Sequence, residues 1–229
     1  MISVCMATYN GANYIKEQVD SILMQLGVDD ELIVSDDGST DDTISILESY
    51  NDDRIKIHTD NKRKGVVGNF ENALKKSKGD YIFLSDQDDI WMDNKVELCL
   101  KELETYDMIM HDAKVIRNGE IFINSYFSHR IYNPGYLNNI IRPCYLGCCM
   151  AFKRSLLCRV LPIPSVSHDT YIGLIGDLYL KTKRIDNQLI YYRRHDNNAS
   201  QVVEHNTKSI FARILTRLQI IFYTLLKSK

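Results

Sequence analysis

Short apolar or β-branched runs alternate with helical patterns through the first half of the chain, and this alternation restricts the fold more than any other feature. The runs lie at 2–7, 31–35, 54–58 and 81–85, and the helical patterns at 14–26, 40–50 and 68–77. Strands separated by helices of this length pair in parallel through right-handed crossovers, with helices over both faces. We therefore expect an open, mostly parallel α/β sheet, in which ligands bind beyond the carboxyl ends of the strands.

The second half has a mixed pattern. A helix is expected at 93–105, followed by a hairpin whose strands, 108–116 and 120–123, are joined by a two-residue Asn-Gly turn. The stretch 127–143 shows no clear period and contains a Pro-Gly pair, so we expect a long loop of the kind that often forms a lid. A core strand is expected at 150–152 and another at 189–193.

The length of 229 residues suits one α/β domain with a tail. We expect a catalytic domain at 1–203, with a donor half at about 1–112 and an acceptor half at about 113–203. The remaining tail, 204–229, is amphipathic and basic.

Composition and charge exclude several classes of protein. The 28 basic and 30 acidic residues nearly cancel, so no overall field recruits nucleic acid and we expect no nucleic-acid partner. The six cysteines lack paired zinc spacing and are expected to be reduced thiols. The first residues lack the basic and apolar segments of a signal peptide, and no window approaches about 18 continuous apolar residues. We therefore expect a cytoplasmic protein without a transmembrane helix.

Three carboxylates in four residues follow the expected strand at 81–85, in the order Asp86, Gln87, Asp88 and Asp89. Like charges this close are unfavourable unless a cation neutralises them, and hard oxygen ligands suit Mg²⁺ or Mn²⁺. A divalent ion held by a carboxylate and by a substrate diphosphate would meet both requirements. The alternative is a solvated acidic turn, which the position after an apolar strand makes less favourable.

A second acidic pair, Asp36 and Asp37, follows the expected strand at 31–35. The next residues, from Gly38 to Asp41, are explained by a tight turn and by capping of the following helix. Capping leaves Asp36 and Asp37 unexplained, and carboxylates at a strand end can accept hydrogen bonds from a base N–H or from ribose hydroxyls.

Five segments occur in an order and spacing that resemble the family 2 glycosyltransferases across roughly residues 1–200. They are ISVCMATYNG from Ile2, ELIVSDDGSTD from Glu31, Gly68-Asn69 with Asn72, GDY from Gly79 and DQDDIW from Asp86. The resemblance implies a GT-A fold, a nucleotide-sugar donor and inversion at the anomeric carbon. It implies donor-binding roles for Thr8, Asn10, Asp36, Asp37, Asn69, Asp86, Gln87 and Arg194, and metal ligation by Asp88 and His195.

The resemblance also implies a catalytic base at Asp169, because the family places an acidic residue at the start of a helix, and His168-Asp169 opens one here. The alternative role for Asp169 is that of a first-turn partner of the helix dipole, and the two roles are compatible. The late segment Tyr192 to His195 resembles the family's Tyr-Arg-x-His segment. Asp196 departs from the family, in which glycine is frequent at that position.

Acceptor-side roles are implied for Trp91, Gly147, Cys148 and His168. Each has a competing structural explanation. A core strand after a turn explains the residues that follow Gly147 and Cys148, and a Trp after an acidic turn is more often a packing anchor than a sugar platform.

The tail from 208 to 229 places apolar residues on one helical face and basic residues opposite, with Ile220 interrupting the polar face. Such a helix could lie on the inner face of the cell membrane as a peripheral anchor, near a glycan or lipid-linked acceptor. The alternatives are a helix packed on the domain and a homodimer contact.

Other functions remain in competition. A sugar nucleotidyltransferase needs a Gly-rich basic loop after the first strand, and a Walker loop needs a Lys-Ser/Thr pair; the sequence has neither. A catalytically inactive protein that binds nucleotide, a membrane or a partner is the third reading, and the presence of both Asp88 and Asp169 opposes it. The DQDDIW segment is most similar to rhamnosyltransferase members, which implies dTDP-rhamnose as donor, and a UDP-sugar remains open.

Overall fold

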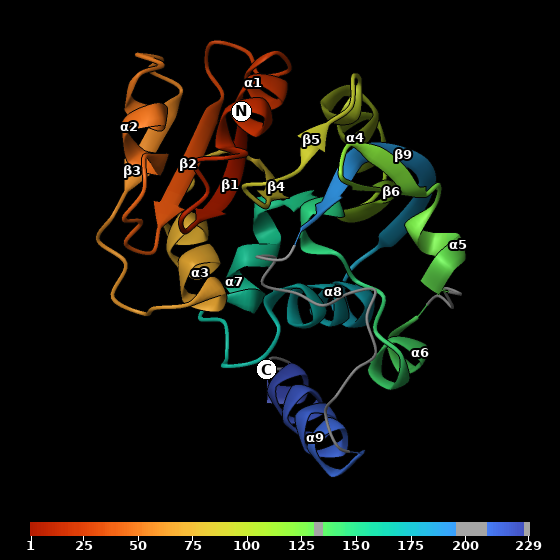
Figure 1. Cartoon of the computed structure of the whole chain (residues 1–229). Coiled ribbons are helices and arrows are strands. Elements are labelled where there is room, and N and C mark those ends of the chain that lie inside the picture. The colour runs from red at the N-terminus through yellow and green to blue at the C-terminus, as the bar shows by residue number, and fades with distance from the viewer. Residues whose placement is uncertain (131–134, 196–209, 227–229) are drawn as a thin grey trace.

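The computed structural model describes residues 1–130, 135–195 and 210–226, with the side chains of 210–214 and 216 left aside. Among these residues the strands form one nine-stranded sheet in the order β3-β2-β1-β4-β8-β6-β9-β5, with β7 paired to β6 (Figure 1). The expected GT-A-like α/β fold is confirmed. The expected domain and half boundaries remain predictions.

The first four strands are parallel, and all of them except the partly exposed third are buried. They are β1 (Ile2–Thr8), β2 (Glu31–Asp36), β3 (Ile55–His58) and β4 (Tyr81–Ser85). β1 pairs with β2 on one side and β4 on the other, so the carboxyl ends of these three strands meet at one edge of the sheet. Burial of an apolar side chain such as Phe83 or Leu84 stabilises the fold by about 1.5 to 3 kcal/mol.

The second half of the sheet is mixed rather than parallel. β8 (Met150–Lys153) is antiparallel to both β4 and β6 (Met108–Arg117), whereas β6 and β9 (Thr182–Arg194) are parallel. β9 is much longer than the expected strand at 189–193. β7 (Glu120–Ile123) forms the expected hairpin with β6, and β5 (Ile90–Trp91) adds an unexpected edge strand beside β9.

The expected helices are present. Those expected at 14–26, 40–50 and 93–105 are shorter than expected, whereas the one expected at 68–77 spans 66–76. α3 packs on β1 and β2, and α4 packs near β6, β8 and β9. The larger elements are α1 (Ile15–Leu23), α2 (Thr43–Glu48), α3 (Val66–Lys76), α4 (Lys95–Leu103), α8 (His168–Tyr179) and α9 (Ile210–Leu226). The short ones are η1 (Gly147–Cys149), η2 (Arg154–Leu156) and α7 (Leu157–Val160).

The expectation of a loop at 127–143 was wrong where the structure describes the chain. Two short helices occupy the stretch, α5 (Tyr126–Arg130) and α6 (Tyr136–Ile141). Tyr126 and Phe127 are buried, so contacts with the core stabilise a segment whose sequence shows no helical period. Residues 131–134 of the expected lid lie outside the described residues.

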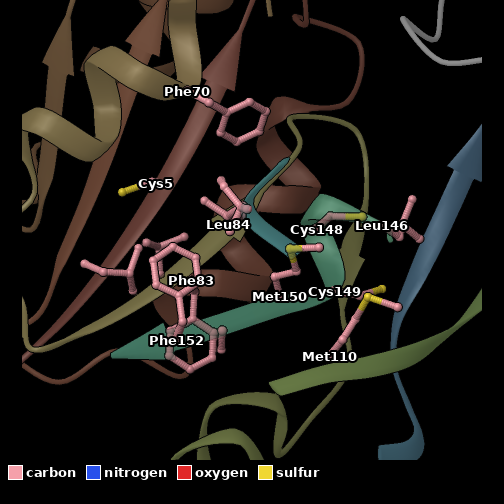
Figure 2. Close-up of a cluster of buried hydrophobic side chains, with 14 of the residues drawn as sticks. Cys5, Phe70, Phe83, Leu84, Met110, Leu146, Cys148, Cys149, Met150 and Phe152 are labelled. Atoms are coloured by element: carbon pink, nitrogen blue, oxygen red, sulfur yellow. The ribbon is translucent and has the colours of Figure 1, made fainter. Parts of the chain in front are cut away.

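The core is continuous across the parallel and mixed parts of the sheet. Figure 2 shows Phe83, Cys148, Cys149, Met150 and Phe152 among the buried side chains of one cluster. η1 therefore links the end of β4 to the second half of the molecule through buried side chains.

No helix in the described part of the chain is long and apolar enough to cross a membrane. Of the expected tail, 204–209 and 227–229 lie outside the described residues, as does Asp196. α9 covers the rest, packing against α6 and α8 (Figure 1).

Candidate active site

A cleft of about 400 Å³ opens where β1, β2 and β4 end. Its walls come from both halves of the molecule, because η1 and the start of α8 face the strand ends across it. Nine of the expected site residues line it: Thr8, Asp37, Asn69, Asp86, Gln87, Asp88, Gly147, His168 and Asp169.

Asp36 supports the cleft from behind. Its Oδ2 accepts a hydrogen bond from the Thr8 hydroxyl at 2.8 Å, and its Oδ1 accepts from the backbone N–H groups of Gly38 and Ser39 at 2.9 and 2.7 Å. Gly38 has a φ of 93°, a conformation that favours glycine. Asp36 is buried and is not among the residues that line the cleft, so in this structure it orders the loop that carries Asp37.

Asp37 and Asn69 occupy the wall nearest β1. The Asp37 Oδ2 accepts from the N–H of Gly65 at 2.7 Å, and the Asn69 side chain donates to the Thr8 carbonyl at 3.0 Å. The Asn69 Oδ1 is buried and has no hydrogen-bond partner among the described residues. This wall can therefore offer a carboxylate and an amide oxygen to the N–H and hydroxyl groups of a ligand.

Asn10 and Gln87 organise the loop after β1. The Gln87 side chain accepts from the Tyr9 N–H at 2.9 Å and donates to the Tyr9 carbonyl at 3.1 Å. Asn10, at a φ of 49°, accepts from the N–H of Thr40 at 2.8 Å. Both side chains are thus engaged with backbone, and Asn10 does not line the cleft.

Asp88 and His195 meet although they lie on different elements. The His195 Nε2 lies 2.9 Å from the Asp88 Oδ2, and the imidazole stacks on Tyr14 with ring centroids 4.4 Å apart. Arg193 donates its Nε–H to the Asp88 carbonyl at 2.9 Å and pairs with Glu17. Arg193 of β9 therefore holds the Asp88 backbone, and His195, just after β9, contacts its carboxylate.

The partly buried Asp86 carboxyl group and the buried Asp89 carboxyl group lie close together. Burial, together with the charges of Asp88 and Asp169, raises the pKa of Asp86 to about 7. Burial and the charges of Asp88 and Asp86 also raise the pKa of Asp89 well above its ordinary value. The cluster therefore carries fewer negative charges at neutral pH than its composition suggests.

Two groups in this region could be considered for a metal ion. Ligand atoms of Asp86, Asp89 and Cys148 lie within 4.8 Å of one another. Asp89 and Cys148 are fully buried, and burial raises the pKa of the Cys148 thiol well above its ordinary value, so this thiol is a poor ligand. Asp88 lines the cleft beside Asp86 and touches His195, and this carboxylate and imidazole set fits Mn²⁺ or Mg²⁺ better.

Asp169 lies in the first turn of α8, on the wall opposite the strand ends. Its Oδ1 accepts from the Thr170 N–H at 2.6 Å and from the Ser167 hydroxyl. These contacts orient the carboxylate. The geometry is compatible with both the base role and the first-turn role.

Of the four residues expected on the acceptor side, Gly147 and His168 line the cleft. Gly147 lines the cleft, and a Cβ at this position would lie 3.0 Å from the His168 Nε2. His168 also lines the cleft, stacks on Phe70 at 4.2 Å, and its Nε2 has no partner within the described chain. Burial lowers the His168 pKa, which favours the neutral imidazole.

Trp91 and Cys148 do not face the cleft, which corrects the expectation that they contact an acceptor. Trp91 is 3% exposed, with its ring against Phe83 and the Lys95 ammonium 3.9 Å from the ring centroid. The Cys148 side chain is fully buried beside Asp86 and Asp89. Both side chains are packing residues because the core closes over them.

Arg194 ends β9 outside the residues that line the cleft, with its guanidinium 6.0 Å from the Tyr192 ring. Tyr9, Phe70 and Tyr192 line the cleft but were not expected there. Tyr9 directly follows Thr8 and could have been found from its place after a strand. Phe70 carries no local signal, because an apolar residue at such a position usually belongs to a core. Tyr192 begins the family-like segment at 192–195 and could have been found from it.

The comparisons with known proteins agree with this geometry. Residues 3–161 match the family model described as Glycosyl transferase family 2. A relative from Escherichia coli, UDP-Glc:alpha-D-GlcNAc-diphosphoundecaprenol beta-1,3-glucosyltransferase WfgD, is 29% identical over 173 residues, which cover 75% of this chain and 67% of the relative.

Two solved structures share the fold. S. aureus TarS 1–349 in complex with UDP-GlcNAc matches with a TM-score of 0.74 and 21% identity over 97% of this chain and 66% of that chain, just under two thirds. The glucosyl-3-phosphoglycerate synthase from Mycobacterium tuberculosis, in complex with Mn²⁺, UDP and glucosyl-3-phosphoglycerate, matches with a TM-score of 0.63 and 20% identity over 99% of this chain and 79% of that chain. At these identities the likeness shows the fold alone.

Proposed function

This chain belongs to glycosyl transferase family 2, and on that premise we propose that it moves a sugar from a nucleotide-diphosphate donor to an acceptor hydroxyl with inversion at the anomeric carbon. The observation that carries the proposal is one cleft lined by Asp37, Asp88 and Asp169. Asp37 follows β2, Asp88 follows β4 and Asp169 lies in α8. In this proposal they supply a nucleotide wall, a metal ligand and a carboxylate base.

The nucleotide is proposed to bind against the wall formed by Thr8, Asp37 and Asn69. The buried Asn69 Oδ1 and the Asp37 carboxylate offer acceptors to base N–H or ribose hydroxyl groups. Asp88 and His195, with Asp86 beside them, would hold Mn²⁺ or Mg²⁺. When bound, that ion would stabilise the charge that develops on the departing diphosphate.

Asp169 is proposed to be the base. Its hydrogen bonds with Thr170 and Ser167 hold one carboxylate oxygen, so the group is oriented before substrate binds. It would take the proton from the acceptor hydroxyl as that oxygen attacks the anomeric carbon. Gly147 leaves room for the acceptor next to the neutral His168.

The acceptor is proposed to be a lipid-linked glycan in polysaccharide synthesis. The relative WfgD is named for transfer of glucose to GlcNAc on diphosphoundecaprenol, a lipid carrier. An acceptor of this kind would bring the reaction to a membrane surface. The same name, together with the UDP-GlcNAc in the TarS structure, favours a UDP-sugar as donor.

A thermal-shift panel tests the donor proposal. We expect UDP or a UDP-sugar to raise the melting temperature in a Mn²⁺-dependent way, because a ligand that binds only the folded state stabilises it. A rise with dTDP-rhamnose alone would reject the UDP-sugar in favour of a rhamnosyl donor. No rise with UDP, dTDP, GDP or their sugars would favour a catalytically inactive protein.

A further inference from the structure

α9 is attached to the domain by a narrow face. Ile220 and Thr224 are fully buried, and the Thr224 hydroxyl shares a hydrogen bond of 2.8 Å with the Tyr136 hydroxyl of α6. The Tyr179 hydroxyl of α8 donates to the Thr224 carbonyl at 3.0 Å. The residue that interrupts the polar face in the sequence, Ile220, therefore points inward, and the apolar face of the helix is left outward.

Exposed apolar side chains occur on α9 and also on α6, a helix that contacts it. Leu137 and Ile141 of α6, which contacts α9, are 74% and 79% exposed. The exposed apolar side chains of α9 are between 49% and 59% exposed. We call these residues together the α6–α9 surface: Leu137, Ile141, Leu215, Leu218, Phe222, Leu225 and Leu226.

The charged residues that the structure describes at this surface, Arg142 and Arg217, are both basic. Arg142 follows Ile141 and is exposed, and Arg217 lies among the apolar residues of α9. The sequence from 205 to 229 contains no Asp or Glu and five basic residues: Lys208, Arg213, Arg217, Lys227 and Lys229. A broad apolar face bordered by cations complements an anionic bilayer, whose headgroups attract the cations while its acyl boundary accepts the apolar side chains.

We propose that the α6–α9 surface docks this protein on an anionic lipid bilayer. The inference extends the proposed function, since a membrane surface is where a lipid-linked acceptor would be found. Charge argues against a second copy of the chain as occupant. A two-fold contact would place the same cationic residues of both copies against each other, which is unfavourable without acidic partners.

Co-sedimentation with vesicles tests the docking surface directly. The probe is phosphatidylcholine vesicles with and without phosphatidylglycerol, free of any glycan lipid. We expect the full chain to sediment with the anionic vesicles and to be released by salt. The double variant L218E/F222E, changed only at exposed positions, should bind at least about tenfold more weakly, because the glutamates oppose both the apolar and the electrostatic attraction.

A matched variant tests whether vesicle binding depends on the α6–α9 surface or on exposed apolar residues in general. M24E/V28E also replaces two exposed apolar residues, 76% and 90% exposed, outside this surface, and should sediment like the unchanged protein. Binding lost equally in both variants, or no sedimentation of the unchanged protein, would overturn the proposal. A second result would also overturn it: the unchanged protein is a dimer, and L218E/F222E makes it a monomer without changing vesicle binding.

The Mn²⁺-dependent thermal shift with UDP is measured on the same samples. L218E/F222E should retain it, because the substituted residues do not line the cleft. Vesicle binding without a UDP shift would reject the proposed function and keep the docking surface. A UDP shift without vesicle binding would reject the docking surface alone.

Discussion

The His195 imidazole lies 2.9 Å from the Asp88 carboxylate although 107 residues separate them in the chain. The ring of Tyr14, in the loop before α1, stacks on the same imidazole. Three segments that are distant in sequence thus define the position of one carboxylate at the mouth of the cleft.

This contact predicts how metal-dependent donor binding responds to substitution. Asp88→Asn should abolish the Mn²⁺-dependent part of the UDP thermal shift, and His195→Ala should weaken the apparent Mn²⁺ affinity by roughly 10- to 100-fold. Titration of Mn²⁺ at fixed UDP measures both. His58→Ala, a histidine on β3 that does not line the cleft, should behave like the unchanged protein. Equal Mn²⁺ affinity in His195→Ala would remove this residue from the site.

The proposed base role of Asp169 predicts that its substitution affects turnover but not donor binding. Asp169→Asn keeps the shape of the side chain but cannot take a proton, so the turnover rate should fall on the order of 10²- to 10⁴-fold with donor affinity nearly unchanged. Single-turnover transfer and UDP thermal shifts give the two quantities. Asp177→Asn, on the same helix but bonded to Tyr145 and Asn139, is the control and should retain turnover. Full activity of Asp169→Asn would exclude the base role.

The raised pKa of Asp86 predicts a pH-dependent stability cost. Between its ordinary value of 3.8 and about 7, the folded state holds a proton at Asp86 that the unfolded state has lost. The folded state binds more protons in this window, so the Asp86 contribution to stability is present below about pH 4 and declines as the pH rises to about 7. Asp86→Asn should therefore stabilise the protein more at pH 8 than at pH 4, by roughly 2 to 4 kcal/mol.

Urea unfolding in metal-free buffer at the two pH values measures this difference. The same variant should lose Mn²⁺-dependent UDP binding, because Asp86 lines the cleft beside Asp88. A stability difference that does not change with pH would contradict the assignment of the shift to Asp86.

The buried Lys95 leads to a prediction about the stability of the fold beneath the site. Its ammonium is fully buried, donates to the Cys148 carbonyl at 2.9 Å and lies over the Trp91 ring. Lys95→Met keeps most of the volume and leaves that carbonyl without its donor, so we expect a loss of roughly 1 to 3 kcal/mol in unfolding free energy. Lys101→Met, at an exposed position of the same helix, should change stability by less than about 0.5 kcal/mol.

The contrast between Asp88 and Trp91 shows how far sequence reasoning reaches. Asp88 follows a strand whose apolar run is continuous, so its place at the sheet edge follows from local pattern alone. Trp91 lies only three residues further along the chain, yet it is a packing residue. It contacts Phe83 and Lys95, because β5 pairs with β9. No local sequence period predicts this two-residue strand. Without knowledge of the strand, the burial of Trp91 could not be predicted.

The sequence by itself determined the order of strands and helices in the first half and the acidic residues after β2 and β4, because strand length, helical period and the character of the following loop are local properties. Only the tertiary structure decided that Asp36 faces the loop while Asp37 faces the cleft, that His195 reaches Asp88, and that Ile220 rather than Leu218 packs on the domain. These outcomes depend on which distant elements meet, and contacts between distant elements are determined by the packing of the whole chain.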